Sequence, residues 1–441
     1  MRIAVIGTGI SGLACAWLLN QRHTVTVYES EARLGGHSNT VMMPWRGGTV
    51  PVDTGFLVYN EHNYPHLTQM LAHLGVPSKA SDMTFGVSVD GGRFEYAGGT
   101  LTMFAQPSNL ARPRFHGMLR DILRFNRDAR RFLAESGGRE PSLGVFLEDR
   151  GYGEWFRRRY LLPMSAAIWS ASLDGMLDFP ARSLLQFFDN HGLLSYNDRP
   201  QWRTIVGGSK TYVEKLAAPL QGRVKLSTPA VAVRRISGGV EVIDGRGGRT
   251  IFDHVVLACH GDQALRLIER PDPIERTLLG AFRYQANHVV LHRDPNLMPK
   301  RRAVWSSWNY LATSDEEAKV SVTYWLNRLQ GIDPECLALV SLNPIREPDP
   351  ASVVARFDYD HPQHDMGSIA AQRRLAEIQG VHRLWFAGAH WANGFHEDGL
   401  RSGLAVAAGL GVAPPWEPGL ARPWQGSPQT LPETAAAGAA L

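Results

Sequence analysis

The sequence R-I-A-V-I-G-T-G-I-S-G at residues 2–12 decides the first part of the fold. The β-branched and aliphatic run over 2–6 predicts a buried strand, and the apolar pattern over 13–19 predicts a helix. A second β-branched run follows over 24–28 and leads directly into Glu29. A strand, a glycine turn, a helix and a second strand in this order are typical of a unit that binds a dinucleotide.

Each residue of the turn has a physical task in such a unit. Gly7 permits the tight turn, Gly9 lets a pyrophosphate approach the backbone, and Gly12 lets the helix pack closely on the strand. The N-terminus of the helix, which includes Ser11, presents free amides to the phosphates. Glu29 stands where a carboxylate can accept hydrogen bonds from a ribose diol. The regular glycine spacing also argues against a signal peptide in this segment.

The composition is that of an ordinary globular chain of 441 residues, with 44% hydrophobic and 20% charged residues. This length suits two or three interleaved lobes. The net charge of +4 is too small to indicate a nucleic-acid partner. Cys15, Cys259 and Cys336 lie far apart, so we expect no metal site and no disulfide framework, and a reducing cytoplasmic location. No unbroken apolar run of the sequence is long enough for a spanning helix.

A second motif follows the first two predicted strands. Residues 29–37 read E-S-E-A-R-L-G-G-H, and residues 52–56 read V-D-T-G-F. Together they resemble the FAD-binding signature of the flavin amine-oxidase superfamily, which includes monoamine oxidases, protoporphyrinogen oxidase and phytoene desaturases. The resemblance implies FAD rather than NAD, which the first glycine motif alone does not decide. The family often has an arginine where this chain has His37.

The resemblance also assigns contacts to the cofactor. It places the acid on the ribose, the arginine and the glycine pair beside the pyrophosphate and ribityl chain, and the Thr-Gly pair near the isoalloxazine ring. The contacts implied in these two motifs are Glu29, Arg33, Gly35, Gly36, His37, Thr54, Gly55 and Phe56.

Two later stretches complete the resemblance. The strand predicted over 224–233 matches the superfamily strand whose backbone meets the adenine ring, with Val231 at that position. Residues 384–403 read L-W-F-A-G-A-H-W-A-N-G-F-H-E-D-G-L-R-S-G, in which a strand ends at Ala-Gly and a helix follows. The positive end of that helix is expected to face the flavin pyrimidine ring. The contacts expected here are Gly388, Gly399 and Leu400.

The same stretch departs from the amine oxidases proper. It contains no cysteine, so the covalent flavin link of monoamine oxidases is not expected and FAD should bind non-covalently. Ala389 stands where amine oxidases often have an acid. Their aromatic cage commonly includes a tyrosine in this signature, where this chain offers Trp391 and Phe395. These departures lower the expectation of an amine substrate.

These segments predict an α/β fold, α+β overall, with a Rossmann-like FAD-binding domain and an inserted substrate domain of mixed sheet and helices. The predicted boundaries are 1–60, 205–275 and 380–412 for a discontinuous FAD-binding domain, 61–204 and 276–379 for the substrate domain with its helical insertion, and 413–441 for a disordered Pro/Ala-rich tail.

The segment Pro113–Ser136 of the insertion predicts an amphipathic helix. Its apolar residues recur at helical spacing, while Arg120, Arg124, Arg127 and Arg131 line another face. Such a helix can lie on an anionic bilayer, which would make the protein peripheral on the inner face of the membrane. The alternative is a domain helix with its apolar face in the core and its arginines in water.

Aromatic side chains suggest an apolar substrate pocket. The stretches 160–170 and 187–194 are dense in aromatic and aliphatic residues, and the β-like runs over 303–310 and 320–326 add more. Ordinary core packing explains each of them equally well. The candidates for the lining are Trp169, His191, Trp305, Trp308 and Tyr310.

Four further stretches narrow the resemblance. They are S-D-M-T-F at 81–85, P-Q-W at 200–202, W-S-S-W-N at 305–309 and G-F-H-E-D-G at 394–399. They look like the flavoprotein domain that is fused in front of some cyclopropane-fatty-acid synthases, and like its free-standing bacterial relatives. This resemblance implies a lipid-linked role with unsaturated or methylated acyl chains, and a lipid methyltransferase as a partner.

The main functional hypothesis is an FAD-dependent oxidoreductase that abstracts hydride from an apolar small molecule or a phospholipid acyl chain. The candidates for a catalytic base are His396 and Glu397, which precede the flavin-facing helix, followed by Tyr324. Glu397 and Asp398 can equally cap that helix. Three alternatives stay open: a flavin-dependent double-bond isomerase of acyl chains, an amine oxidase, and a non-catalytic flavoprotein partner of a lipid methyltransferase.

Overall fold

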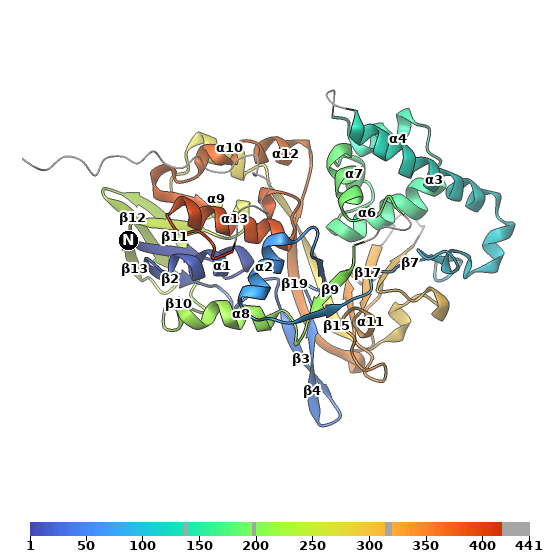
Figure 1. Ribbon diagram of the computed structural model, residues 1–441, viewed down its shortest axis with the longest axis horizontal. Helices are drawn as coiled ribbons and strands as arrows, with labels where there is room; N and C mark the ends of the chain where they lie inside the picture. The colour runs from blue at the N-terminus through green and yellow to red at the C-terminus, as the bar shows by residue number, and fades with distance from the viewer. Residues whose placement is uncertain (136–139, 196–199, 314–319, 417–441) are drawn as a thin grey trace, which may run out of the picture.

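The computed structural model describes residues 1–135, 140–195, 200–313 and 320–416. Ser136 and the predicted tail from residue 417 onward lie outside the described residues. Figure 1 shows one lobe around the N-terminal strands and a second lobe that carries the helices of the insertion.

The first lobe is built on a parallel sheet of five strands. Its order is β10 (Val224–Lys225), β2 (Thr24–Tyr28), β1 (Arg2–Ile6), β14 (His254–Leu257) and β20 (Leu384–Phe386). Each neighbouring pair is parallel. The strands therefore come from three distant parts of the chain. Because β2 and β14 lie on opposite sides of β1, the carboxyl end of β1 is the point where the strand order reverses, and ligands of such sheets bind there.

The side chains of this sheet alternate between two cores. Ile3 and Val5 of β1 pack with helices of one face, among them α1 (Ile10–Leu19) and α13 (His396–Gly409). Ala4 and Ile6 pack on the other face with the antiparallel sheet β11 (Ala230–Ile236), β12 (Gly239–Asp244) and β13 (Arg249–Phe252). Burial on both faces explains why β1 is apolar throughout instead of alternating with polar residues.

The second lobe contains a seven-stranded sheet. Its order is β19 (Val353–Gln363), β15 (Arg283–His292), β18 (Leu339–Leu342), β17 (Val320–Trp325), β16 (Trp308–Ala312), β7 (Phe85–Val89) and β8 (Phe94–Ala97). All pairs are antiparallel except β16 with β7. The sheet and the helices of the insertion share one hydrophobic core.

The remaining strands of the described residues form two small sheets. The remaining strands are β3 (Thr40–Trp45) and β4 (Gly48–Asp53), which form a hairpin that projects from the body in Figure 1, and β5 (Tyr59–Asn60), β9 (Trp202–Ile205) and β6 (Ser78–Ala80), which pair with one another. The remaining α-helices are α2 (Pro65–His73), α3 (Pro113–Ala134), α4 (Leu143–Asp149), α5 (Glu154–Phe156), α6 (Leu162–Trp169), α7 (Ala181–Asn190), α8 (Lys210–Ala217), α9 (Gly261–Leu267), α10 (Pro273–Leu279), α11 (Leu326–Leu329) and α12 (Met366–Gln372).

The predicted fold class is confirmed, and one predicted strand is divided. The sequence predicted a single strand over 224–233, but the structure has β10 and β11 in two different sheets. Ser227 between them has a φ of 47°, and its amide donates to the carbonyl of Glu31. This turn moves the chain from the parallel sheet to the antiparallel one. The exact limits of the two domains stay a prediction.

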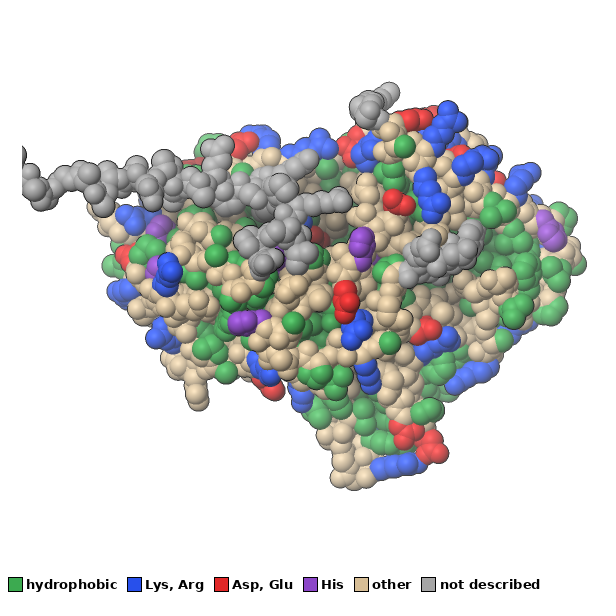
Figure 2. All heavy atoms as spheres, in the orientation of Figure 1, with side chains coloured by type: hydrophobic (Ala, Val, Ile, Leu, Met, Phe, Trp, Pro, Cys, Tyr) green, Lys and Arg blue, Asp and Glu red, His purple; other side chains and the backbone are tan. Residues whose placement is uncertain are grey.

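The predicted amphipathic helix is α3, and its apolar face is buried. Phe115, Met118 and Phe125 lie in the core of the second lobe. Figure 2 shows Lys and Arg side chains gathered over this region, and Arg127 and Arg131 are exposed. Contact of this basic face with a bilayer stays a prediction. Among the described residues, no helix is both long enough and apolar enough to cross a membrane.

The approach of α1 to α13 gives a first test of this fold. A Cβ at Gly403 would overlap the backbone carbonyl of Ser11, whereas a Cβ at Gly117 in α3 would meet no atom within 4 Å. We expect Gly403→Ala to lower the free energy of unfolding in urea by about 1–3 kcal/mol. The matched variant Gly117→Ala should be neutral or raise it by up to about 1 kcal/mol. Equal effects of the two substitutions would contradict this account of the α1–α13 contact.

Candidate active site

One cavity of about 1060 Å³ lies between the carboxyl edge of the parallel sheet and the second lobe. We call the part beside the parallel sheet the cofactor end; it is lined by residues 6–11, 28–30, 35–37, 229–231, 258–260 and 388–390. We call the part beside the second lobe the apolar end; it is lined mainly by Met83, Phe85, Met164, Ile168, Trp169, Phe187, Leu193, Trp202, Trp308, Tyr324 and Phe395. Ligand pockets usually measure about 300–1,000 Å³, so this cavity is at the upper limit.

The glycine turn forms the floor of the cofactor end. Gly7 has a φ of 103°, a left-handed conformation that favours glycine, and a Cβ there would overlap the carbonyl of Ala258. A Cβ at Gly9 would meet no protein atom within 4 Å, although Gly9 lines the cavity. The N-cap residue of α1 is Gly9, which has no side chain that could bond the amides of the first turn. The first turn of α1 therefore presents free amides to the cavity, as a diphosphate requires.

Glu29 lies at the end of β2 with a buried carboxylate that lines the cavity. One oxygen accepts hydrogen bonds from the backbone amide of Thr8, at 2.9 Å, and from its hydroxyl. The other oxygen accepts from the amide of Glu31 at 2.9 Å. The turn and the carboxylate thus hold each other in place at the edge where the sequence predicts the ribose.

Sixteen of the predicted site residues line the cavity. They are Gly7, Gly9, Ser11, Glu29, Gly35, Gly36, His37, Gly55, Phe56, Val231, Gly388, His396, Tyr324, Trp169, His191 and Trp308. They come from segments far apart in the sequence, and the structure brings them to one surface. Their roles toward a ligand stay predictions.

Several predicted cofactor contacts lie behind the cavity wall instead. A Cβ at Gly12 would overlap the carbonyl of Gly7, so this glycine serves the packing of the turn on α1. Arg33 donates to the carbonyl of Gly36 at 2.7 Å. The Thr54 hydroxyl is bonded to Tyr359 at 2.8 Å. Gly399 and Leu400 also lie behind the wall: a Cβ at Gly399 would be 3.0 Å from Ser11 Oγ, and Leu400 is buried in the core between α13 and the sheet.

His37 lines the cavity where the family often has an arginine. Its Nε2 is buried without a hydrogen-bond partner among the described residues. Burial, followed by the neighbouring His361, holds the pKa of His37 well below its usual value. This nitrogen is enclosed by protein, so His37 lines the cavity through its other atoms.

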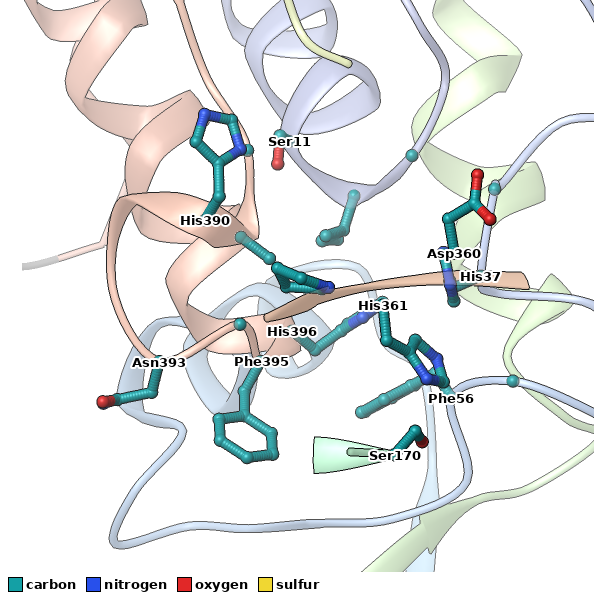
Figure 3. A pocket seen from close by; sticks show the side chains of 18 of the residues that line it. Ser11, His37, Phe56, Ser170, Asp360, His361, His390, Asn393, Phe395 and His396 are labelled. Carbon is teal, nitrogen blue, oxygen red and sulfur yellow. The ribbon is translucent and has the colours of Figure 1, made fainter. Parts of the chain in front are cut away.

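His396 is the first residue of α13 and lies at the boundary of the two ends of the cavity (Figure 3). Its ring stacks on Phe56 with centroids 3.8 Å apart. Its Nε2 lies 2.6 Å from the hydroxyl of Tyr212 and 3.3 Å from the hydroxyl of Ser38. Burial lowers the pKa of His396 to about 3, so the imidazole is neutral near pH 7.

Glu397 does not line the cavity, which corrects its prediction as a catalytic base. Its two oxygens accept hydrogen bonds from the backbone amides of His66, at 2.9 Å, and Leu67, at 3.0 Å. It therefore caps α2 and ties this helix to α13. The neighbouring Asp398 accepts from the amide of Phe395 at 3.0 Å and so closes the turn before α13. The capping alternative from the sequence therefore describes Asp398, whereas Glu397 caps α2 and not the helix that was expected.

Two predicted lining residues also lie elsewhere. The indole of Trp305 donates to the carbonyl of Pro299 at 2.8 Å, and the guanidinium of Arg302 lies 3.7 Å from its ring centroid. This indole belongs to a turn outside the cavity. Tyr310 is buried in the core of the second lobe. It lies two residues beyond Trp308 on β16, past the end of the cavity.

The apolar end carries few polar groups. Trp308 and Tyr324 are paired residues of β16 and β17, with ring centroids 4.8 Å apart. Burial raises the pKa of Tyr324, so its hydroxyl stays protonated. His191 donates through Nδ1 to the carbonyl of Phe187 at 2.8 Å, and burial lowers its pKa to about 4. This end therefore offers a ligand neutral donors and apolar surface, beside the carboxylate of Asp82, which is paired with Arg328.

The structure adds lining residues that the sequence did not predict. His361 lies on β19 and lines the cavity. Its Nδ1 accepts a hydrogen bond from the side-chain nitrogen of Asn287 at 3.2 Å, and the side-chain oxygen of Asn287 accepts one from Asn343. No local motif marks this position. His260 and Cys259 follow β14 and could have been found, because the residues after each strand of a parallel sheet face its ligand.

The residues at the cofactor end fit a dinucleotide. The open space over Gly9, the free amides of α1 and the carboxylate of Glu29 supply the room, the donors and the acceptor that a diphosphate and a ribose need. The fold and this site therefore define a dinucleotide-binding α/β protein with a second lobe over its cofactor.

Comparison with known families identifies the group within this class. The model of the family described as flavin containing amine oxidoreductase matches residues 10–290. The chain belongs to this family. It is an FAD-dependent oxidoreductase.

Solved structures share the whole fold at low sequence identity. Cyclohexylamine oxidase from Brevibacterium oxydans IH-35A is 18% identical with a TM-score of 0.66, over 92% of this chain and 98% of that one. A putative protoporphyrinogen oxidase from Exiguobacterium sp. 255-15 is 15% identical with a TM-score of 0.66, over 93% and 98%. The CLA-producing fatty acid isomerase from P. acnes is 15% identical with a TM-score of 0.64, over 91% and 96%. At these identities the similarity shows the fold alone.

The position of Glu29 predicts a loss of cofactor affinity when its carboxylate is removed. We expect Glu29→Ala to raise the Kd for FAD about 10- to 100-fold, because hydrogen bonds to a charged group contribute about 1.5–3 kcal/mol. Fluorescence titration of the apoprotein with FAD measures this change. The exposed neighbour Glu31 provides the control, and Glu31→Gln should bind FAD like the wild type. Similar affinities of the two variants would contradict the ribose assignment.

The buried position of Glu397 predicts a pH-dependent stability. Burial raises the pKa of its carboxyl to about 7, so between about pH 4.5 and 7 the folded protein holds a proton that the unfolded chain has lost. The stability from this group is complete at the lower pH and is lost as the pH rises through 7, by at most about 1.4 kcal/mol per pH unit. Glu397→Gln should lack this component. The free energies of unfolding of both proteins, measured in urea at several pH values, test this. The same pH dependence for the wild type and the variant would refute it.

Proposed function

We propose that this protein is an FAD-dependent dehydrogenase that abstracts hydride from an apolar acyl-chain substrate. The observation that carries the proposal is the apolar end of the cavity, which is continuous with the cofactor end and is walled by aromatic and aliphatic side chains. Burial of apolar surface is the force that such a wall can use to bind a chain of methylene groups.

The chain's own residues would hold the cofactor and orient the substrate. The turn at Gly7–Gly9, the free amides of α1 and the carboxylate of Glu29 would hold FAD, which supplies hydride acceptance when bound. Trp308, Tyr324 and Phe395 would position the chain and exclude water from the reacting carbon. Burial raises the pKa of Cys259 to about 12, so this cavity thiol stays protonated, which supports non-covalent binding.

Among the described residues, the apolar end offers an amine substrate no carboxylate without a partner, so an amine would depend on the aromatic side chains there. A bound ammonium needs a carboxylate or an aromatic cage. Asp82 lines the apolar end with a carboxylate. This carboxylate already accepts a hydrogen bond from Arg328 at 3.0 Å. The family description and the cyclohexylamine oxidase fold keep amine oxidation as an outcome that the experiment must test.

A double-bond isomerase is the second candidate. The fold similarity to the CLA-producing fatty acid isomerase favours it, because that structure shows that this architecture can act on a fatty acid without being an amine oxidase. An isomerase would return the hydride to the same acyl chain and would need no external acceptor. A non-catalytic flavoprotein that serves a lipid methyltransferase would show neither reaction.

Anaerobic absorbance of the FAD-loaded protein separates these functions. We expect saturated, unsaturated or mid-chain-methylated phospholipid acyl chains to bleach the oxidised flavin band, with one new double bond per flavin found in the lipid by mass spectrometry. Turnover of unsaturated chains without an acceptor would indicate the isomerase. Bleaching by primary amines and not by lipids would contradict the proposal. An unchanged spectrum together with unchanged lipid would indicate the non-catalytic role.

A variant in the wall tests the role of the apolar end. Ile168 of α6 lines the cavity, and Ile168→Asp should lower kcat/KM for the acyl substrate about 10- to 100-fold, because a charge replaces apolar surface worth about 1.5–3 kcal/mol. Its FAD content should remain that of the wild type. Leu123 on α3 is 62% exposed, so Leu123→Asp is the control and should leave kcat/KM unchanged. Equal rates for both variants would place the substrate elsewhere.

A further inference from the structure

The hydrogen bonds around His396 connect three segments that lie far apart in the sequence. Ser38 follows the glycine pair after β2, Tyr212 lies on α8, and His396 begins α13. Each of the three polar atoms lies within hydrogen-bond distance of the other two: Tyr212 Oη to His396 Nε2 at 2.6 Å, Ser38 Oγ to His396 Nε2 at 3.3 Å, and Ser38 Oγ to Tyr212 Oη. Ser38 and Tyr212 are buried.

The number of hydrogens in this triangle decides the tautomer of the histidine. If Nε2 carries no hydrogen, the Tyr212 hydroxyl donates to Nε2 and the Ser38 hydroxyl donates to Tyr212 Oη, so both hydroxyl hydrogens have an acceptor. If Nε2 carries a hydrogen, three donors point at two oxygen acceptors, and one hydroxyl is left with no acceptor among the described residues. A buried hydroxyl without an acceptor costs about 1–3 kcal/mol. The first arrangement is therefore the stable one.

The other nitrogen of His396 must then carry the hydrogen and face the cavity. Nδ1 has no hydrogen-bond partner among the described residues. It is also not fully buried by them, so it is open to a ligand. The residue is half-buried and lines the cavity, and its ring plane is fixed by the stack on Phe56. Figure 3 shows the imidazole among the side chains around the pocket.

We propose that Tyr212 and Ser38 are positioning residues that hold neutral His396 as the Nδ1–H tautomer, so that this N–H is a fixed donor toward an acceptor atom of the bound flavin ring. His396 then acts as a hydrogen-bond donor and not as a base, because its only basic lone pair is occupied by Tyr212. The proposal rests on the FAD cofactor and is independent of which substrate the apolar end binds, so it can fail while the proposed function holds.

Nitrogen NMR of the protein labelled with ¹⁵N-histidine tests the tautomer directly. The signals of His396 are identified as those missing in His396→Gln. We expect wild-type His396 to carry its hydrogen on Nδ1 in the apoprotein, and its Nδ1 signal to shift when FAD is added. A hydrogen on Nε2, or an Nδ1 signal that FAD does not shift, would overturn the proposal. This result needs no variant of the positioning residues.

Two variants test the cause of the tautomer. Tyr212→Phe removes the donor to Nε2, so the fraction of His396 that carries its hydrogen on Nε2 should rise. Ser38→Ala keeps the Tyr212 donor, so His396 should stay in the Nδ1–H form. Tyr59→Phe is the matched control, because Tyr59 is a buried tyrosine whose hydroxyl donates to Ser78 at 2.9 Å. The same His396 tautomer in Tyr212→Phe and Tyr59→Phe would overturn the role of Tyr212.

The midpoint potential of bound FAD tests the donor role. His396→Leu loses the donor, and we expect the potential to fall by up to about 30 mV, which corresponds to a tenfold change in a two-electron equilibrium. His396→Asn retains an amide N–H close to the position of Nδ1 and should restore most of the wild-type potential. A purely structural role would shift both variants alike, and that result would overturn the proposal.

Discussion

The contact between α1 and α13 is the constraint on which the rest of the molecule depends. The backbone of Ser11, in the first turn after the glycine loop, lies against Gly403 of a helix almost four hundred residues later in the chain, and its hydroxyl lies against Gly399 of the same helix. Any larger side chain at Gly403 would overlap the carbonyl of Ser11. Because the two helices can approach so closely, the N-termini of both reach the same cavity.

This arrangement places two positive helix ends and several neutral histidines around one site. The amides of α1 are free for a diphosphate, while α13 presents His396 at its start. Burial keeps the pKa values of His37, His361 and His396 low, so these side chains line the site without adding charge. The positive potential toward the cofactor therefore comes from the helix N-termini and from Arg266, and not from these histidines.

The cofactor end could be predicted from the sequence because its signals are local. The turn over 7–12 and the acid at 29 have fixed spacing, and the physics of phosphate and ribose binding dictates the residue types. The helix α3 was also predicted, since its apolar pattern repeats over several turns.

The rest depended on packing that no local pattern records. Trp308 and Tyr310 lie on the same face of β16, but the cavity ends between them. The two-residue period of a strand could therefore not separate a lining residue from a core residue. Glu397 stands beside the flavin-facing residues in sequence, yet its partner is the N-terminus of α2. His361 belongs to a long strand with no motif, and only the sheet brings it to the cavity.

The central claim is that one cavity holds FAD at one end and an apolar chain at the other. The most direct test is a crystal structure of the FAD-loaded protein grown with a mid-chain-unsaturated fatty acid. The account predicts density for the chain between Trp169, Trp308 and Phe395, with its double bond beside the flavin ring. A chain bound outside the cavity, or a flavin ring that itself fills the space between these three side chains, would contradict it.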